Sequence, residues 1–105
     1  MTDHKLAHLV FFSLADKSPE SVNAHVEACH KYLNNHDGVT YFAAGVLGTE
    51  FEREVNDRDF DVLCQVVFES REAHDAYQTA ERHLQFIAEN KDKWTNVRIF
   101  DTWVR

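Results

Sequence analysis

Two runs of strand-forming residues that are apolar at nearly every position constrain the fold most strongly. HLVFFSL covers residues 8–14, and VLCQVVF covers residues 62–68 with only Gln65 polar. An alternating strand buries one face, whereas a continuously apolar strand must be covered on both faces. Both runs are therefore predicted to be central strands of a sheet.

Helix start signals follow each of these two strands. After the first strand, Ser18 is a suitable N-cap and Pro19 suits the first helical position, which predicts a helix over about 19–35. After the second strand, Ser70 caps a helix that is predicted to begin at about Arg71. Each central strand is thus followed by a helix.

The remaining segments supply two further strands. Residues 39–48 are predicted to form a strand in which Gly45 indicates a bulge or a close backbone approach. The highly charged residues 49–58 suit a solvent-exposed connection, so this strand and the run at 62–68 most simply form a hairpin. Residues 97–104 close the chain as a fourth strand.

The element order is β-α-β-β-α-β, which predicts a single α+β domain over residues 1–105. The expected architecture is ferredoxin-like, a four-stranded antiparallel sheet with both helices on one face. The other face would expose apolar side chains, because Phe11 and Phe12 follow one another. We therefore expect a homodimer that packs sheet against sheet as a dimeric α/β barrel. Which phenylalanine faces the partner depends on register.

Charge and composition exclude several classes of partner. The net charge is −7 without any cluster of Lys and Arg, so nucleic acid is not expected as a partner. No apolar run approaches the ~20 residues of a membrane span, and MTDHKLAHLV lacks the features of a signal peptide, which favours the cytoplasm. Cys29 and Cys64 are too isolated for a CxxC motif and are interpreted as small buried hydrophobes.

Four segments carry a resemblance to a known family. They are the opening strand HLVFFSL, DGVTYF after the first helix, the strand-to-helix junction VVFES, and AYQTAERHLQF. Over about residues 7–104 the chain resembles the stress-responsive α/β-barrel (Dabb) family of plants and bacteria. The resemblance implies a dimeric ferredoxin-like fold.

The resemblance also implies a site. The family's plant polyketide cyclases use a Tyr and a His six residues apart in a pocket between sheet and helices, and the matching residues here are Tyr77 and His83. By resemblance, His83 would be the catalytic base, Tyr77 would steady an oxyanion, and His8 would be the first-strand histidine of the same pocket. No cofactor is implied by this branch.

Geometry adds a condition to this site. Six residues along a straight helix place two side chains ~120° apart and ~9 Å along the axis, so Tyr77 and His83 could not meet. We therefore predict that the helix is interrupted between Gln78 and His83. His8, Tyr77 and His83 would then line one partly apolar pocket for a small hydrophobic molecule.

Three functions remain open from the sequence. The first is a small-molecule-binding protein, or a cofactor-free acid–base enzyme of cyclase or lyase type with His83 as the base. The second is a non-enzymatic stress or binding module. The third draws on the wider dimeric α/β-barrel superfamily and is a cofactor-free monooxygenase or a haem-degrading enzyme, in which His83 would be an axial ligand.

The seven histidines show no pattern typical of metal binding. No pair forms HxxxH on one helix and HExxH is absent, so no metal site built from neighbouring ligands is expected. Solvated histidines are the better interpretation for those on predicted helical surfaces or helix ends, which are His25, His30, His36 and His74. Gly-rich phosphate loops and GxSxG elbows are also absent.

Overall fold

A computed structural model describes residues 4–105 of the chain; the first three residues, part of the segment considered above for a signal peptide, lie outside the described part. The elements in order are β1 (Lys5–Leu14), α1 (Pro19–Leu33), β2 (Val39–Val46), β3 (Val62–Phe68), α2 (Arg71–Thr79), α3 (Glu81–Asn90), a 3₁₀ turn (Lys91–Lys93) and β4 (Trp94–Val104). The predicted α+β class and element order are confirmed, with the second helix divided in two.

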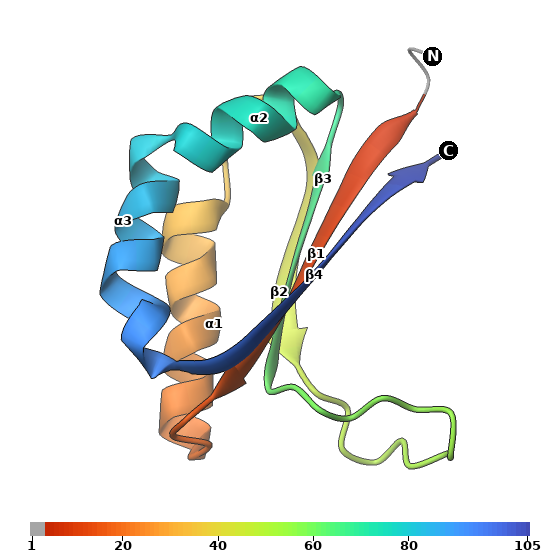
Figure 1. Ribbon diagram of the computed structural model, residues 1–105, viewed down its shortest axis with the longest axis vertical. Coiled ribbons are helices and arrows are strands. Elements are labelled where there is room, and N and C mark those ends of the chain that lie inside the picture. Colours follow the sequence, from red (N-terminus) through yellow and green to blue (C-terminus); the bar gives the residue numbers. More distant parts are fainter. Residues whose placement is uncertain (1–3) are drawn as a thin grey trace.

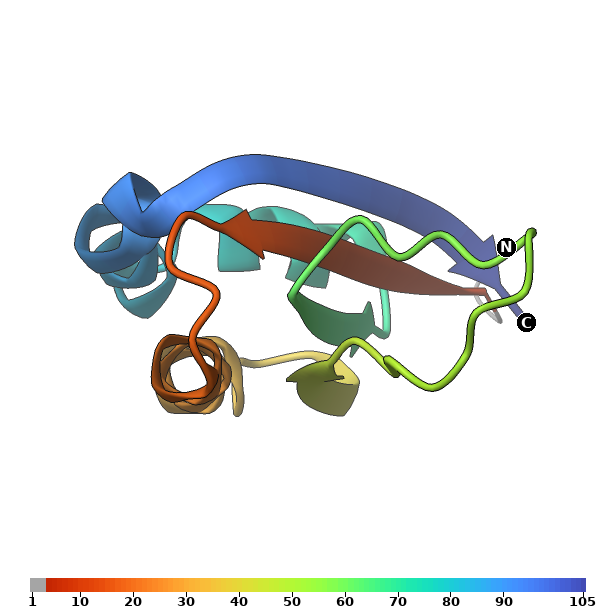
Figure 2. The same ribbon diagram turned by 90° about the horizontal axis from the view of Figure 1, so that it is seen from below.

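The four strands form one antiparallel sheet in the order β2-β3-β1-β4. The two continuously apolar strands, β1 and β3, are therefore the central ones, and β2 pairs with β3 as the predicted hairpin. The helices all lie on one side of the sheet, and the connection between β2 and β3 extends on the other side (Figures 1 and 2). This is the expected ferredoxin-like arrangement.

Local signals fix the helix starts. The hydroxyls of Ser18 and Ser70 each accept a hydrogen bond from the backbone N–H three residues later, as N-caps do. Gly38 follows α1 with a φ of +81°, and a Cβ at this position would lie 2.4 Å from the Cβ of Ala73 in α2. Glycine is therefore required where the start of β2 passes the start of α2.

Side chains along each strand point alternately to the face of the sheet that packs under the helices and to the opposite, open face. Phe12 points to the helices and is 3% exposed, whereas Phe11 points to the open face and stacks edge-on against Phe60, with ring centroids 4.9 Å apart. This register assigns Phe11, not Phe12, to the face that a partner subunit could cover.

The open face carries a groove of about 390 Å³ that no helix of residues 4–105 covers. It is lined by Leu9, Phe11, Asp57, Phe60, Arg98, Phe100 and Thr102. Arg98 donates to Asp57 at 2.9 Å, which ties the β2–β3 connection to β4 beside the groove. The apolar character of this face agrees with the sequence argument that a second layer is needed.

The bulge or close approach predicted at Gly45 was wrong. The irregularity of β2 lies between Val39 and Tyr41, where Thr40 is the extra residue and its hydroxyl donates to the Val67 carbonyl at 3.2 Å. Gly45 is in regular register, and a Cβ there would contact nothing within 4 Å, so it marks neither a bulge nor a close approach.

His25, expected to be solvated, is 2% exposed. Its Nε2 accepts a hydrogen bond from the Trp94 indole at 2.8 Å, and its ring packs 4.6 Å from that of Phe12. A buried imidazole with a satisfied nitrogen is stable in a core, and the register of α1 on the sheet decides which helical histidine is buried. His30 is exposed, as predicted. In the described part of the chain, no helix has the length and apolar character needed to cross a membrane.

A candidate acid–base cavity at the broken second helix

The predicted interruption of the second helix is confirmed. α2 ends at Thr79, Ala80 is extended with φ −64° and ψ 142°, and α3 begins at Glu81. The backbone N–H of Ala80 donates three residues back, to the Tyr77 carbonyl at 3.1 Å, which is a tight final turn rather than a continuing α-helix. The chain therefore changes direction between Tyr77 and His83.

Hydrogen bonds from Arg82 attach the start of α3 to the end of α1. Its guanidinium donates to the backbone carbonyls of Tyr32, at 3.2 Å, and Asn34. These carbonyls lie at the end of α1, where helical carbonyls lack partners within the helix. One side chain thus satisfies the end of α1 and anchors the first turn of α3.

The break brings Tyr77 and His83 into contact, with ring centroids 4.6 Å apart. Nδ1 of His83 lies 3.1 Å from the Gln78 carbonyl, which the end of α2 leaves free. A carbonyl can only accept, so Nδ1 carries the proton and Nε2 keeps the lone pair. Burial lowers the pKa of His83, and the nearby His8 and other imidazoles act in the same direction. His83 is therefore an unprotonated base at neutral pH.

Tyr77 is suited to donate a hydrogen bond. The side chain is 3% exposed, and burial raises its pKa above the ordinary tyrosine value, so the hydroxyl stays protonated. Within residues 4–105, the Tyr77 hydroxyl has no hydrogen-bond partner. Every side-chain nitrogen or oxygen that is fully buried in this part of the chain does have one, so the hydroxyl oxygen is not fully buried. The hydroxyl oxygen must therefore keep access to open space, and it can serve as a donor for a ligand.

Tyr77 and His83 line a cavity of about 140 Å³ between the sheet and α2–α3. The cavity is mostly apolar, and its lining residues are His8, Val10, Phe12, Leu33, Tyr77, Gln78, His83, Phe86, Ile87, Trp94, Val97 and Ile99. The three residues expected from the sequence thus share one cavity. Its size is close to that of the ~150 Å³ engineered cavity that binds benzene.

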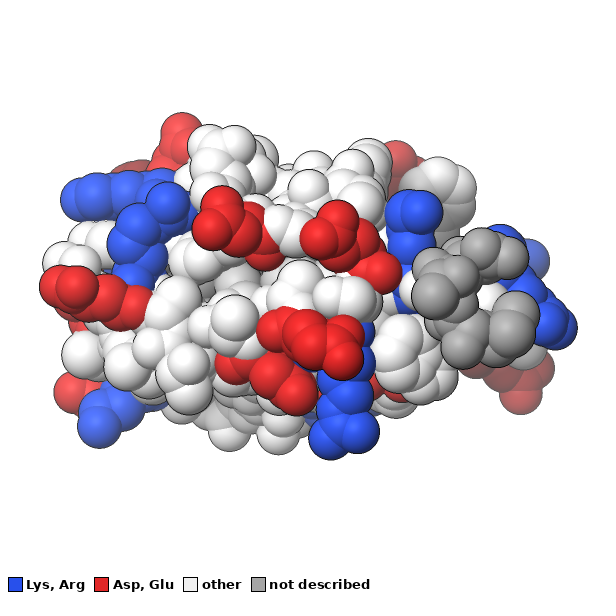
Figure 3. Space-filling view, turned by 90° about the horizontal axis from the view of Figure 1, so that it is seen from above, with Lys and Arg blue, Asp and Glu red and all other residues white. Residues whose placement is uncertain are grey.

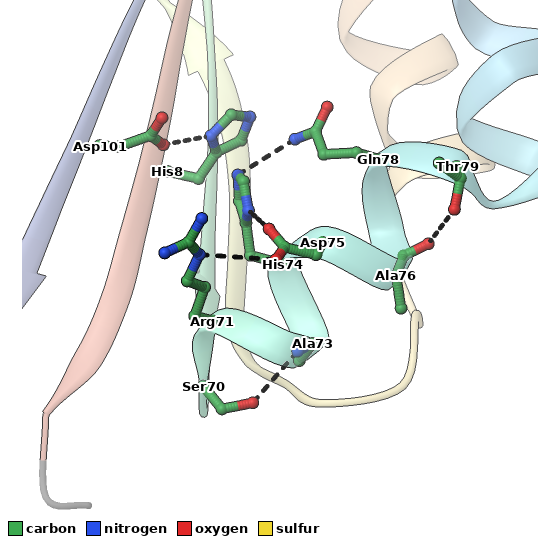
Figure 4. Close-up of polar contacts among 10 residues, drawn as sticks. All are labelled: His8, Ser70, Arg71, Ala73, His74, Asp75, Ala76, Gln78, Thr79 and Asp101. Atoms are coloured by element: carbon green, nitrogen blue, oxygen red, sulfur yellow. Dashed lines mark hydrogen bonds and ion pairs between the residues drawn. The ribbon is translucent and has the colours of Figure 1, made fainter. Parts of the chain in front are cut away.

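His8 enters the cavity from β1 and is 4% exposed. It lies directly opposite Asp101 of β4, and its Nδ1 is 2.5 Å from the Asp101 carboxylate (Figure 4). Asp101 is not among the site residues expected from the sequence. Asp101 is the one acidic residue of β4, and the register between β1 and β4 is needed to place it beside His8.

His74 is a second correction to the expected solvated histidines. Its side chain is 17% exposed, and its ring lies 5.2 Å from that of His8. Nδ1 of His74 is 3.0 Å from the Asp75 carboxylate, and the Gln78 amide nitrogen is 3.2 Å from Nε2 (Figure 4). One helical turn before Gln78, His74 faces the sheet because α2 lies across the end of β1.

Comparison with known proteins identifies the family and the fold. Residues 6–104 match the family described as the stress responsive A/B barrel domain (Dabb). A dimeric ferredoxin-like protein of unknown function from Thermobifida fusca has a TM-score of 0.78 at 14% identity, covering 99% of this chain and 94% of that one. A Dabb family protein from Mesorhizobium loti has a TM-score of 0.76 at 18% identity, with coverages of 94% and 95%.

A hydroxynitrile lyase from Passiflora edulis is also similar, with a TM-score of 0.77 at 14% identity and coverages of 98% and 95%. Among curated protein sequences, none is significantly similar to this chain. At these identities the structural likeness establishes the fold. On the face shown in Figure 3, Asp and Glu side chains lie between small groups of Lys and Arg side chains.

Proposed function

The chain belongs to the stress-responsive α/β-barrel (Dabb) family, and we propose that it is a homodimeric protein that binds a small carbonyl compound and deprotonates it without a cofactor. The observation that carries this proposal is the helix break at Ala80, which sets the His83 imidazole 4.6 Å from the Tyr77 ring inside one apolar cavity. A base and a neutral donor are the two groups that enolisation requires.

In the proposed reaction, Nε2 of His83 takes a proton from the carbon next to the carbonyl. The electron pair of the broken C–H bond forms the C=C bond of an enolate, and the negative charge moves to the carbonyl oxygen. The Tyr77 hydroxyl donates a hydrogen bond to that oxygen in a site of low dielectric, where such a bond is strong. Return of the proton from His83 completes exchange or isomerisation.

The cavity volume selects among the functions left open by the sequence. About 140 Å³ accommodates a ligand near the size of one six-membered ring. A linear tetraketide and a haem macrocycle are both much larger, so this geometry favours neither the cyclase reaction nor axial ligation of haem by His83. A small ketone or aldehyde fits.

The same groups could also catalyse a lyase reaction, with 2-hydroxynitriles as a second substrate class. The similar protein from Passiflora edulis is described as a hydroxynitrile lyase. On a 2-hydroxynitrile, His83 would take the hydroxyl proton and the O–H electron pair would form the C=O bond of the product. The C–C bond to the nitrile would break, its electron pair would leave with cyanide, and the protonated imidazole would give the proton to cyanide. Acetone cyanohydrin is small enough for the cavity and serves as the probe.

Proton exchange tests the proposal directly. Cyclohexanone incubated with the protein in D₂O should lose its α-proton NMR signals faster than in buffer, and His83→Gln and Tyr77→Phe should each reduce this excess rate at least tenfold. His30→Gln, on the exposed face of α1, is the matched control and should leave the rate unchanged. Cyclohexanone binding without exchange would support the binding module and reject the enzyme.

The proposed homodimer is supported by the uncovered apolar face around Phe11. The similar protein from Thermobifida fusca is described as dimeric. Sedimentation equilibrium at micromolar concentration should give twice the chain mass of 12.2 kDa. A mass near 12.2 kDa would remove this part of the proposal. The cytoplasmic location remains a prediction from the sequence.

A further inference from the structure

Around His8, which lines the cavity, three metal-ligating side chains come from three different elements. His8 lies on β1, His74 on α2 and Asp101 on β4, and one ligand atom from each lies within 4.8 Å of the others. None of these residues is a sequence neighbour of another, which is why inspection for HxxxH or HExxH patterns could not find the group. We propose that they bind one divalent transition-metal cation, with Zn²⁺ as the reference ion.

The ligand types suit such an ion. Two imidazoles and one carboxylate are common ligands of Zn²⁺ and of neighbouring transition metals, whereas Mg²⁺ and Ca²⁺ prefer oxygen ligands alone. The carboxylate of Asp101 is accessible to an ion from solvent, because its side chain is 44% exposed. A three-residue site leaves a fourth position for water.

The His8–Asp101 pair already points two ligand atoms at one place. Nδ1 of His8 and Oδ1 of Asp101 are 2.5 Å apart, with the imidazole proton between them. A cation would replace that proton and would need the two atoms about 3.4 Å apart, as two ligands at ~2.1 Å in tetrahedral geometry require. Asp101 can make this small movement because it lies on an edge strand and is half exposed.

The ring nitrogen of His74 that would not bind the metal has a carboxylate partner, as metal-binding histidines usually do. Nδ1 of His74 faces the Asp75 carboxylate at 3.0 Å, so this nitrogen holds the proton and Nε2 holds the lone pair (Figure 4). That lone pair already accepts from the Gln78 amide at 3.2 Å, a partly buried contact between neutral groups that a cation can displace. Asp75 thus fixes the tautomer that the proposed site needs.

This proposal does not depend on the proposed enolisation, because His83 and Tyr77 are not among the ligands. Isothermal titration of the tag-free protein with ZnCl₂ at pH 7.5 should show one saturable site per chain. His74→Gln and Asp101→Asn should weaken Zn²⁺ binding at least tenfold, and Asp75→Asn should weaken it by about 10-fold to 100-fold. His83→Gln and His30→Gln should bind as the wild type does.

Co²⁺ provides a second readout that a purely structural effect would not produce. Loading should give visible absorption bands of a nitrogen-and-oxygen site in the wild type and in His30→Gln, and these bands should be absent in His74→Gln. Thermal unfolding followed by circular dichroism must show that His74→Gln is folded during the titration, and Asp101→Asn gives an independent test if it is not. Absence of stoichiometric binding by the wild type, or unchanged affinity in both variants, would overturn the assignment.

Discussion

Replacing His83 by alanine should remove the proposed base at a modest cost in stability. The variant loses one partly buried hydrogen bond, from Nδ1 to the Gln78 carbonyl at 3.1 Å, which contributes about 1 kcal/mol. It also loses the ring contact with Tyr77, worth roughly 0.5–1.5 kcal/mol, and gains a few tenths of a kcal/mol in helix propensity at the start of α3. The expected loss in the free energy of unfolding is about 1–2 kcal/mol.

Urea unfolding followed by Trp94 fluorescence measures this loss, because the indole packs 5.9 Å from the core ring of Phe86. Protein concentration must be constant across variants, since the stability of the proposed dimer would depend on it. Phe86→Ala, which empties a position that is 2% exposed, should cost about 3–5 kcal/mol and calibrates a core defect. His30→Ala should unfold as the wild type does.

Activity completes this prediction. His83→Ala should lose the excess α-proton exchange of cyclohexanone in D₂O while remaining folded at 25 °C. A loss of 3 kcal/mol or more would show that His83 holds the fold together, and exchange at the wild-type rate in a folded variant would show that another group is the base. Either result would refute the reasoning.

Three further predictions follow from the described contacts. Phe11→Asp should convert the proposed dimer to a monomer in sedimentation experiments, whereas the loop control Val55→Asp, at a position 81% exposed, should not. Gly38→Ala should lower the free energy of unfolding by roughly 2–4 kcal/mol, because its φ is +81° and its Cβ would lie 2.4 Å from that of Ala73; an unchanged urea midpoint would contradict this. Burial lowers the folded-state pKa of His83 below 6.5, so between these two pKa values the unfolded chain binds more protons than the folded chain. The stability linked to neutral His83 should therefore be complete above pH 6.5 and should be lost as pH falls through the folded-state pKa. In urea unfolding measured over a series of pH values, His83→Gln should remove this part of the pH dependence.

Much of the fold could be predicted from the sequence because its strongest signals are local. The continuous apolar runs identified β1 and β3 as central strands, and Ser18 and Ser70 identified two helix starts. The facing of Phe11 depended on the register between strands, which a one-residue slip reverses. Sequence pattern alone therefore left the partner-facing residue open.

The residues of the candidate site were likewise predictable only in part. The spacing of Tyr77 and His83, together with the family resemblance, predicted the helix break correctly. Asp101 and His74 could not be found because their proximity to His8 arises from the β1–β4 register and from the way α2 crosses the sheet. Tertiary placement, rather than local propensity, decides which polar side chains converge.

The most direct test of the proposed carbonyl-binding cavity is to locate the site at which a small ketone binds. Nuclear Overhauser effects between cyclohexanone and protein with labelled aromatic side chains distinguish the inner cavity from the larger groove on the open face. We predict contacts from cyclohexanone to the rings of Tyr77 and His83. Contacts to Phe60 and Phe100 in the groove instead, or no contacts at saturating ketone, would contradict it.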